Sequence, residues 1–152
     1  MHPYLQTILA AMTPIGELRL SIPLALTAFD LTVVEAYIIS VVGNLIPPIF
    51  LLLFLEAVSK FLNKHSVLFK KFFEWFFNRT RRNVAGKYKK YGYFALVILV
   101  AIPLPITGAW TGSAAAYLLG IPFWRAYSLI ALGVAIAGII VTLASLGIIT
   151  LI

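Results

Sequence analysis

Apolar residues fill most positions of this chain, and the polar residues gather in a few places. Two stretches, residues 31–57 and 121–152, are apolar over more than the roughly 20 residues that a helix needs to cross a bilayer. In the first, Pro47-Pro48 removes backbone donors and predicts a kink. In the second, Gly133, Gly138 and Gly147 offer small positions for close helix packing. The pattern predicts two spanning helices.

Two further apolar stretches, residues 4–29 and 93–119, are interrupted at their centres. Each break leaves two arms of about ten residues, about 15 Å as helix, which reach only about the bilayer midplane. Proline and glycine permit the chain to turn there, and the freed backbone groups need a polar or protein-lined environment. We therefore expect two re-entrant helical hairpins. Their tips are marked by four prolines, with the second tip extending to Gly112: Pro14 and Pro23, then Pro103 and Pro105.

The order hairpin, tight turn, span occurs twice. Residues 31–37 align with 121–127 at an offset of 90, and Pro14-Ile15 aligns with Pro105-Ile106 at an offset of 91. The sequence thus predicts a single all-α membrane domain of two inverted repeats, 1–57 and 93–152, joined by a connector, 58–92. The identical pairs at the offset of 90 include Ala36/Ala126, Tyr37/Tyr127 and Gly43/Gly133.

A different interpretation is four ordinary spans with proline kinks. The two interpretations differ in topology. Four spans place both termini in the cytoplasm, whereas two hairpins and two spans place both termini on the opposite side.

Composition and charge distribution place the chain in the membrane. It is 62% hydrophobic and only 11% charged, which excludes an ordinary water-soluble domain. Ten of its 12 Lys and Arg lie in 58–92. A basic loop beside spanning helices marks the cytoplasmic side, so we expect a multi-pass plasma-membrane protein with a cytoplasmic connector. Anionic lipid headgroups are the expected partners of this loop, and nucleic acid is not.

Within the connector, residues 60–77 have apolar positions at helical spacing. This pattern predicts an amphipathic helix in the headgroup plane, with Trp75 at a suitable depth. His65 is expected to be part of that surface anchor rather than a metal ligand or a catalytic group.

Several classes of function are excluded or disfavoured. The chain has no cysteine, so disulfides and thiolate metal sites are ruled out. It has no HExxH, GxSxG or P-loop motif, and its acidic residues are scattered. We therefore expect no enzyme, no metal, no cofactor and no ATP-driven transport by this chain alone. The N-terminus lacks a basic region before its apolar run, so no cleaved signal peptide is expected.

Glu17 and Arg19 lie within the first interrupted stretch. A charge at membrane depth costs a few kcal/mol at least, so it usually has a partner or a wet cavity. Glu17 is a candidate proton-carrying carboxyl, and Arg19 a candidate bidentate ligand for phosphate or carboxylate. The other interpretation is a buried structural ion pair between them. That pair would need a bend, because residues two apart are not neighbours on a helix.

The second tip supplies hydroxyls, backbone amides and an indole donor for an anion or a polar group. Tight helix packing by small residues is the competing explanation. Its candidate site residues are Thr107, Gly108, Trp110, Thr111 and Gly112.

Three further polar residues lie along the spans. Asn44 lies mid-span, where it either caps a freed carbonyl or lines the pathway. Glu35 and Arg125 are equivalent by the repeat and opposite in sign. We expect both to be ordinary charges at helix ends. The alternative for Arg125 is a contact with a phosphate at the cytoplasmic face.

At PIGELRLSIPLAL (residues 14–26), GNLIPP (43–48) and AIPLPITGAWTGSAAAYLLG (101–120), the chain resembles the small multidrug export protein family, a distant branch of the DedA/VTT superfamily. The resemblance implies two re-entrant hairpins packed against spanning helices. From the DedA side it implies proton-linked movement of lipids, notably polyprenyl phosphate carriers. The arginine typical of the DedA second hairpin is absent from residues 103–112, where Trp110 and threonines stand.

Three functions follow from these patterns. The first is a membrane translocase, proton-linked or passive, that moves an amphipathic or lipid-phosphate substrate past the facing tips. The second is drug efflux at the same site, with an apolar cation stacked on Trp110 near Glu17. The third is a non-transporting scaffold that scrambles or organises lipids. A homodimer is plausible in each case, since so short a chain offers few helices to enclose a pathway.

Overall fold

The computed structural model describes residues 2–65, 67–68, 70–71, 74–75, 93–104 and 107–151. Within these ranges all regular structure is helical, which confirms the all-α class. The helices are α1 (Pro3–Met12), α2 (Glu17–Thr27), α3 (Val33–His65), α5 (Phe94–Ala101), α6 (Ala109–Leu118) and α7 (Phe123–Ile149).

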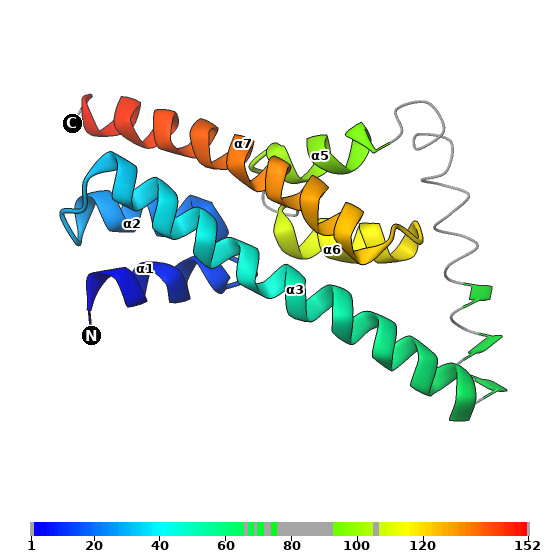
Figure 1. Cartoon of the computed structure of the whole chain (residues 1–152). Coiled ribbons are helices and arrows are strands. Elements are labelled where there is room, and N and C mark those ends of the chain that lie inside the picture. Colours follow the sequence, from blue (N-terminus) through cyan, green and yellow to red (C-terminus); the bar gives the residue numbers. More distant parts are fainter. Residues whose placement is uncertain are drawn as a thin grey trace.

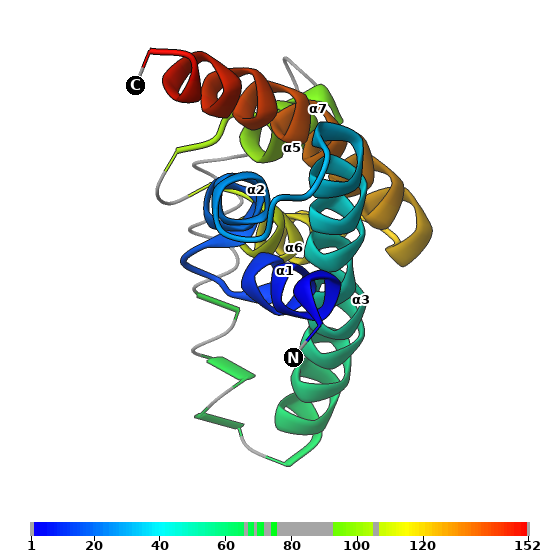
Figure 2. The same ribbon diagram turned by 90° about the vertical axis from the view of Figure 1, so that its left-hand side faces the viewer.

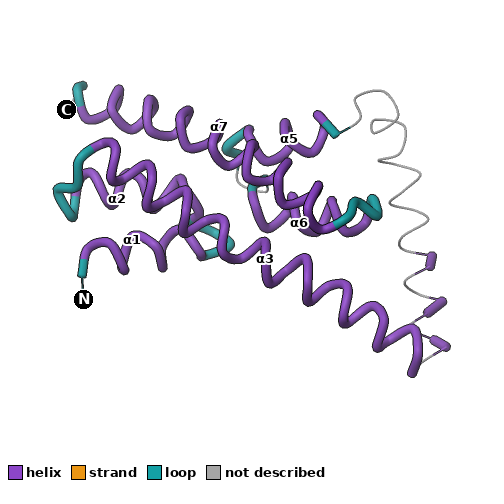
Figure 3. The backbone as a smooth tube through the Cα atoms, viewed as in Figure 1, coloured by secondary structure: helices purple, strands orange, loops and turns teal. Residues whose placement is uncertain are grey.

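Two short helices followed by a long one occur twice along the chain (Figure 1). Neither residues 4–29 nor 93–119 form a continuous helix, so the expectation of a break at the centre of each is confirmed. The turns between α1 and α2 and between α5 and α6 both lie in the middle of the molecule (Figure 3). The two termini lie at one end, and α3 leads toward the connector at the other (Figure 1).

Local chemistry explains where the short helices end. Pro3 begins α1, where its missing N–H is not needed, and the helix stops at Met12, just before Thr13 and Pro14. The Thr13 hydroxyl donates to the Ala10 carbonyl over 2.8 Å and so satisfies one of the last carbonyls of the helix. The helix α5 ends at Ala101, two residues before Pro103. Proline therefore lies at both central breaks.

The prediction that Pro23 belongs to the first tip is wrong. Pro23 does not mark the first tip but lies inside α2, so the first break spans only residues 13–16. The Thr27 hydroxyl donates to the Pro23 carbonyl over 2.8 Å, in the last turn of the helix. A proline inside a helix removes only its own donor, and α2 continues through that loss. Pro105 lies outside the described residues.

The long helices are α3 and α7, and both contain segments long and apolar enough to cross a membrane, Val33–Phe61 and Phe123–Ile149. Pro47 and Pro48 lie within α3, which runs on through both. It also continues to His65, so residues 60–65 form its last turns. The sequence had instead predicted that a separate interfacial helix begins at residue 60. The rest of the predicted amphipathic helix lies mostly outside the described residues.

Helix α2 packs against α1, α3 and α7 (Figure 2), and α7 supplies more residues of the buried apolar cluster than any other described helix. Leu18 and Ile22 of α2 pack with Ile130 and Val134 of α7 in one buried apolar cluster. Many large apolar side chains point outward instead: Val34, Ile38, Val42, Phe50, Leu132, Ile139 and Leu143 are all exposed. So much exposed apolar surface is costly in water and is accounted for by lipid.

The contacts between the two halves are reciprocal. The Tyr37 hydroxyl donates to the Ala135 carbonyl over 3.1 Å, and the Tyr127 hydroxyl donates to the Leu45 carbonyl over 3.3 Å. Each residue of the first bond has its counterpart 90 positions along in the second, with the roles of α3 and α7 exchanged. The two bonds thus join α3 and α7 at equivalent positions of the two halves.

Candidate functional site

The two central breaks meet at Glu17. This residue begins α2, is only 5% exposed and has a positive φ of 45°. Its Oε1 accepts from the backbone N–H of Trp110, in the first turn of α6, over 3.4 Å. The carboxylate therefore lies at the positive end of α6, where a negative charge is stabilised. Both hairpin turns contribute to its environment.

Gly108 is the residue that makes room for this carboxylate. A Cβ built on Gly108 would lie 1.9 Å from Glu17 Oε2 and 2.6 Å from its Cδ. The φ of Gly108 is +134°, a conformation that other residues rarely adopt. The sequence singled out Gly108 for its backbone amide, whereas the structure shows that its missing side chain matters most.

Trp110 ties the two tips together a second time. Its indole Nε1 donates to the Met12 carbonyl at the end of α1 over 3.2 Å. One residue of α6 thus binds both sides of the first break, through its backbone to Glu17 and through its side chain to Met12. The prediction that the tips lie together is borne out for these residues.

Arg19 and Asn44 share a small cavity with Glu17, and its other walls come from Pro103, from residues 107–109 and from apolar side chains of α2, α5 and α7. The cavity measures about 10 Å³, which is room for about one water molecule. No ion pair within 4.0 Å joins Glu17 to Arg19, two residues that the structure fully describes; Lys60 and Glu56 form such a pair near the end of α3. The structural ion pair considered from the sequence is therefore absent here.

The remaining residues of the second tip have structural roles in this conformation. The Thr107 hydroxyl accepts from the Leu104 amide over 3.0 Å and lies against the carbonyl of Ile102, which holds the turn. Gly112 faces Val100, and a Cβ there would lie 2.4 Å from the Val100 side chain. Gly112 thus allows close packing of α5 on α6, and Thr111 is half-buried in α6.

Glu35 and Arg125 lie away from the tips, near the start of α3 and of α7. The Tyr4 hydroxyl donates to Glu35 Oε1 over 2.6 Å, and Arg125 Nη1 donates to the Tyr93 hydroxyl over 3.3 Å. Each bond ties the start of a hairpin to the start of the following long helix. The expectation of helix-end charges agrees with this geometry.

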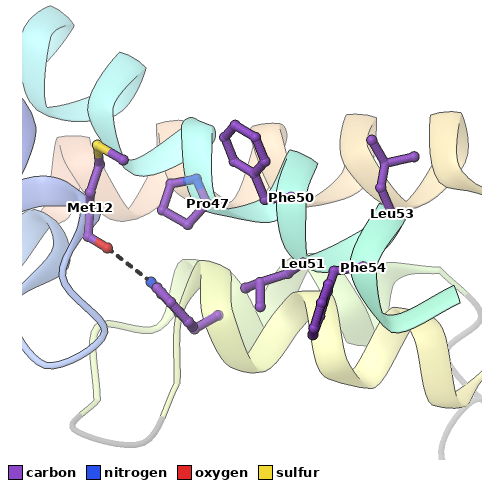
Figure 4. A pocket seen from close by; sticks show the side chains of 7 residues that line it. Met12, Pro47, Phe50, Leu51, Leu53 and Phe54 are labelled. Carbon is purple, nitrogen blue, oxygen red and sulfur yellow. Dashed lines mark hydrogen bonds between the residues drawn. The ribbon is translucent and has the colours of Figure 1, made fainter. Parts of the chain in front are cut away.

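An apolar groove of about 550 Å³ lies beside Trp110 (Figure 4). Its walls come from the end of α1, from α3 and from α6: Met12, Pro47, Phe50, Leu51, Leu53, Phe54 and Trp110. Of these seven groove residues, the sequence analysis predicted only Trp110 as part of a site. The apolar wall on α3 carries no signal in the sequence, because it resembles any lipid-facing surface of a spanning helix.

Comparison with known proteins supports one assignment. Residues 17–140 match the family model described as "Putative small multi-drug export protein". Searches of curated proteins and of solved structures gave no match. The match begins at Glu17, directly after the first break, and covers α2, α3, the second tip and most of α7. With its two long apolar helices, the chain is a membrane protein and belongs to the small multi-drug export protein family, which indicates a role in membrane transport.

Proposed function

We propose that this protein is a translocator whose two hairpins are re-entrant and whose two halves are inverted repeats. The observation that carries the proposal is the contact of Glu17 with Gly108 and Trp110, which joins two helix breaks at the centre of the molecule. Broken helices that meet near the midplane are the usual location of a transporter binding site. The chain itself performs no chemical step in this proposal.

Three sets of contacts support the inverted repeat. The bonds of Tyr37 and Tyr127 exchange α3 and α7 at the offset of 90. The bonds of Tyr4 to Glu35 and of Tyr93 to Arg125 are counterparts at offsets of 89 and 90. Glu17 and Gly108, which are 91 apart, contact each other directly, as residues on a two-fold axis do. The axis therefore passes beside the Glu17 carboxylate.

The inverted arrangement predicts topology. We expect both termini on the side of the plasma membrane opposite the basic connector, because each hairpin returns to the face that it enters. A small epitope tag after Ile152 should be accessible to antibody in intact cells, and a tag in the connector only after permeabilisation. A C-terminal tag hidden until permeabilisation would support four ordinary spans instead.

The site favours an amphipathic substrate. The apolar groove beside Trp110 suits a hydrocarbon or aromatic part, and the bends with Glu17 and Arg19 suit a polar head. We propose that Glu17 takes up and releases a proton during transport, since it is a buried carboxyl at the point where the two breaks meet, bonded to the Trp110 amide. Drug efflux is the second candidate, favoured by the apolar groove at Trp110, whose backbone amide bonds the Glu17 carboxylate.

Transport is tested with purified protein in liposomes under an imposed pH gradient. Two probes separate the candidates: a short-chain fluorescent lipid phosphate and a fluorescent lipophilic cation. Gradient-driven movement of the first supports lipid-phosphate translocation, and movement of the second supports drug efflux. Movement of lipid without any dependence on the gradient would indicate a scramblase, and movement of neither probe above that in empty liposomes would contradict the proposal.

A further inference from the structure

Three buried polar atoms in the described part of the chain have no hydrogen-bond partner: Ser21 Oγ, Ser40 Oγ and Asn44 Oδ1. All three residues are 1% exposed or less. Buried polar atoms are nearly always paired, so each unpaired one points to a missing partner. The positions of these atoms on α2 and α3 indicate the nature of that partner.

The other buried hydroxyls nearby behave differently. Ser113, Thr142 and Ser145 each donate to the carbonyl four residues earlier, over 2.7 Å. This back-bond satisfies a hydroxyl inside its own helix. Ser21 and Ser40 lie in regular helix and do not make it, so their hydroxyls are directed away from their own helix carbonyls.

Ser21 belongs to α2, and Ser40 and Asn44 belong to α3, two helices that pack on each other. These helices are antiparallel neighbours joined by residues 28–32, with the Leu31 amide donating to the Ala25 carbonyl across the turn. Ser21 lies one turn after Glu17, and Ser40 one turn before Asn44, so each pair shares a helix face. Glu17 and Asn44 line one cavity. The two serines therefore fall at the next level, toward the end of the molecule that carries the termini.

The cavity between Glu17 and Asn44 has room for one water, and it has the polar atoms that a water needs. Asn44 Oδ1 and the Glu17 carboxylate are both acceptors, so neither can satisfy the other when Glu17 is ionised. A water has two O–H groups and can donate to both. Arg19 is the other charged residue described at this cavity, and its positive charge disfavours a metal cation there.

We infer that the seam between α2 and α3 binds water at Glu17 and Asn44, continues past Ser21 and Ser40, and is the route by which Glu17 exchanges protons with the terminal end of the molecule. One turn further outward by helix spacing, Ala25 and Ala36 are fully buried, so we take the seam to be closed there by small side chains. Opening it needs a small separation of α2 from α3. The functional part of this inference rests on the proposed proton linkage, whereas the water site does not.

The absence of cysteine makes the seam directly testable, because every introduced thiol is unique. Silver ion is a probe of about water's size that replaces the proton of a thiol in a wet site, and the proton is released to water. Thiols left free are then counted by maleimide labelling after unfolding. Sealed vesicles of known orientation, with the tag after Ile152 as marker, show from which side silver enters.

We expect Ser40→Cys to be blocked about tenfold faster than Val42→Cys, because thiolate forms only where water reaches it. Ser40 is 0% exposed and Val42 is 52% exposed, so simple accessibility predicts the opposite order. Blocking should occur from the side of the termini. Ser40→Cys reacting no faster than Val42→Cys, or reacting only from the connector side, would overturn the inference.

A second pair of variants tests the inference even if the cysteine variant folds poorly. Ser21→Ala and Ser40→Ala each remove an unpaired buried hydroxyl, which should leave thermal stability unchanged or raised. In the liposome assay we expect the double variant to slow proton-driven transport while leaving binding of the probe intact. Unchanged transport would count against the seam as a proton route. Since the silver assay needs no transported substrate, its failure would remove the water route and leave the proposed transport standing.

Discussion

Gly108→Ala should be the most destabilising glycine-to-alanine change among the glycines that the structure describes. The new Cβ would lie 1.9 Å from Glu17 Oε2, and the φ of +134° is strained for alanine. We expect a loss of about 3 kcal/mol or more in the free energy of unfolding, because a buried carboxylate must move away from the α6 N-terminus. Heating the purified protein in detergent and measuring the fraction that stays monodisperse would report the loss.

Two controls make this result specific. Gly147→Ala introduces the same methyl group in α7 where no atom lies within 4 Å, so it should change stability by less than about 1 kcal/mol. Adding Glu17→Ala to Gly108→Ala removes the clashing carboxylate and should restore part of the loss. If the double variant loses as much free energy of unfolding as the two single variants together, the contact between these residues does not cause the loss in Gly108→Ala.

The sequence predicted the positions of the helix breaks well, because proline and glycine act locally. Pro14 and Pro103 lie at the two breaks, where a missing donor and a fixed φ stop a helix whatever surrounds it. Pro23 was placed wrongly because the same residue is also tolerated inside a helix when neighbouring groups compensate. Local chemistry therefore allowed a turn at Pro23 without requiring one.

The contacts that the site residues make could not be predicted from the sequence. Glu17 is recognisable as a costly charge in an apolar stretch, but its contact with Gly108 joins residues 91 positions apart. The role of Trp110 also depends on the distant Met12 carbonyl. The groove on α3 depends on which face of that helix α6 covers, and an almost wholly apolar helix has no polar stripe to reveal it.

The proposed repeat would explain why the two tips differ. At the offset of 91, Glu17 aligns with Gly108 and Arg19 with Trp110, so positions that are charged in one half are small or aromatic in the other. Two carboxylates on the axis would repel each other, whereas a glycine opposite one carboxylate gives it space and backbone donors. Divergence of the two halves at these positions makes one site for one charge.

Glu17→Gln should uncouple transport from the pH gradient. The amide has nearly the shape of the carboxyl, and its oxygen can still accept from the Trp110 amide, so the variant is expected to fold and insert. It cannot take up a proton near neutral pH. We expect the gradient-driven rate in liposomes to fall about tenfold or more, a change of only about 1.4 kcal/mol in the barrier.

Glu56→Gln is the matched control for this change. Glu56 is an exposed carboxylate in the later part of α3 that pairs with Lys60 over 2.6 Å, so its loss removes one surface interaction of small energy. Gradient-driven transport should persist in this variant at close to the rate of the unaltered protein. A Glu17→Gln protein that still responds to the gradient as strongly as Glu56→Gln would show that the proton is carried elsewhere, and the carboxylate on the axis would then serve only to hold the two tips together.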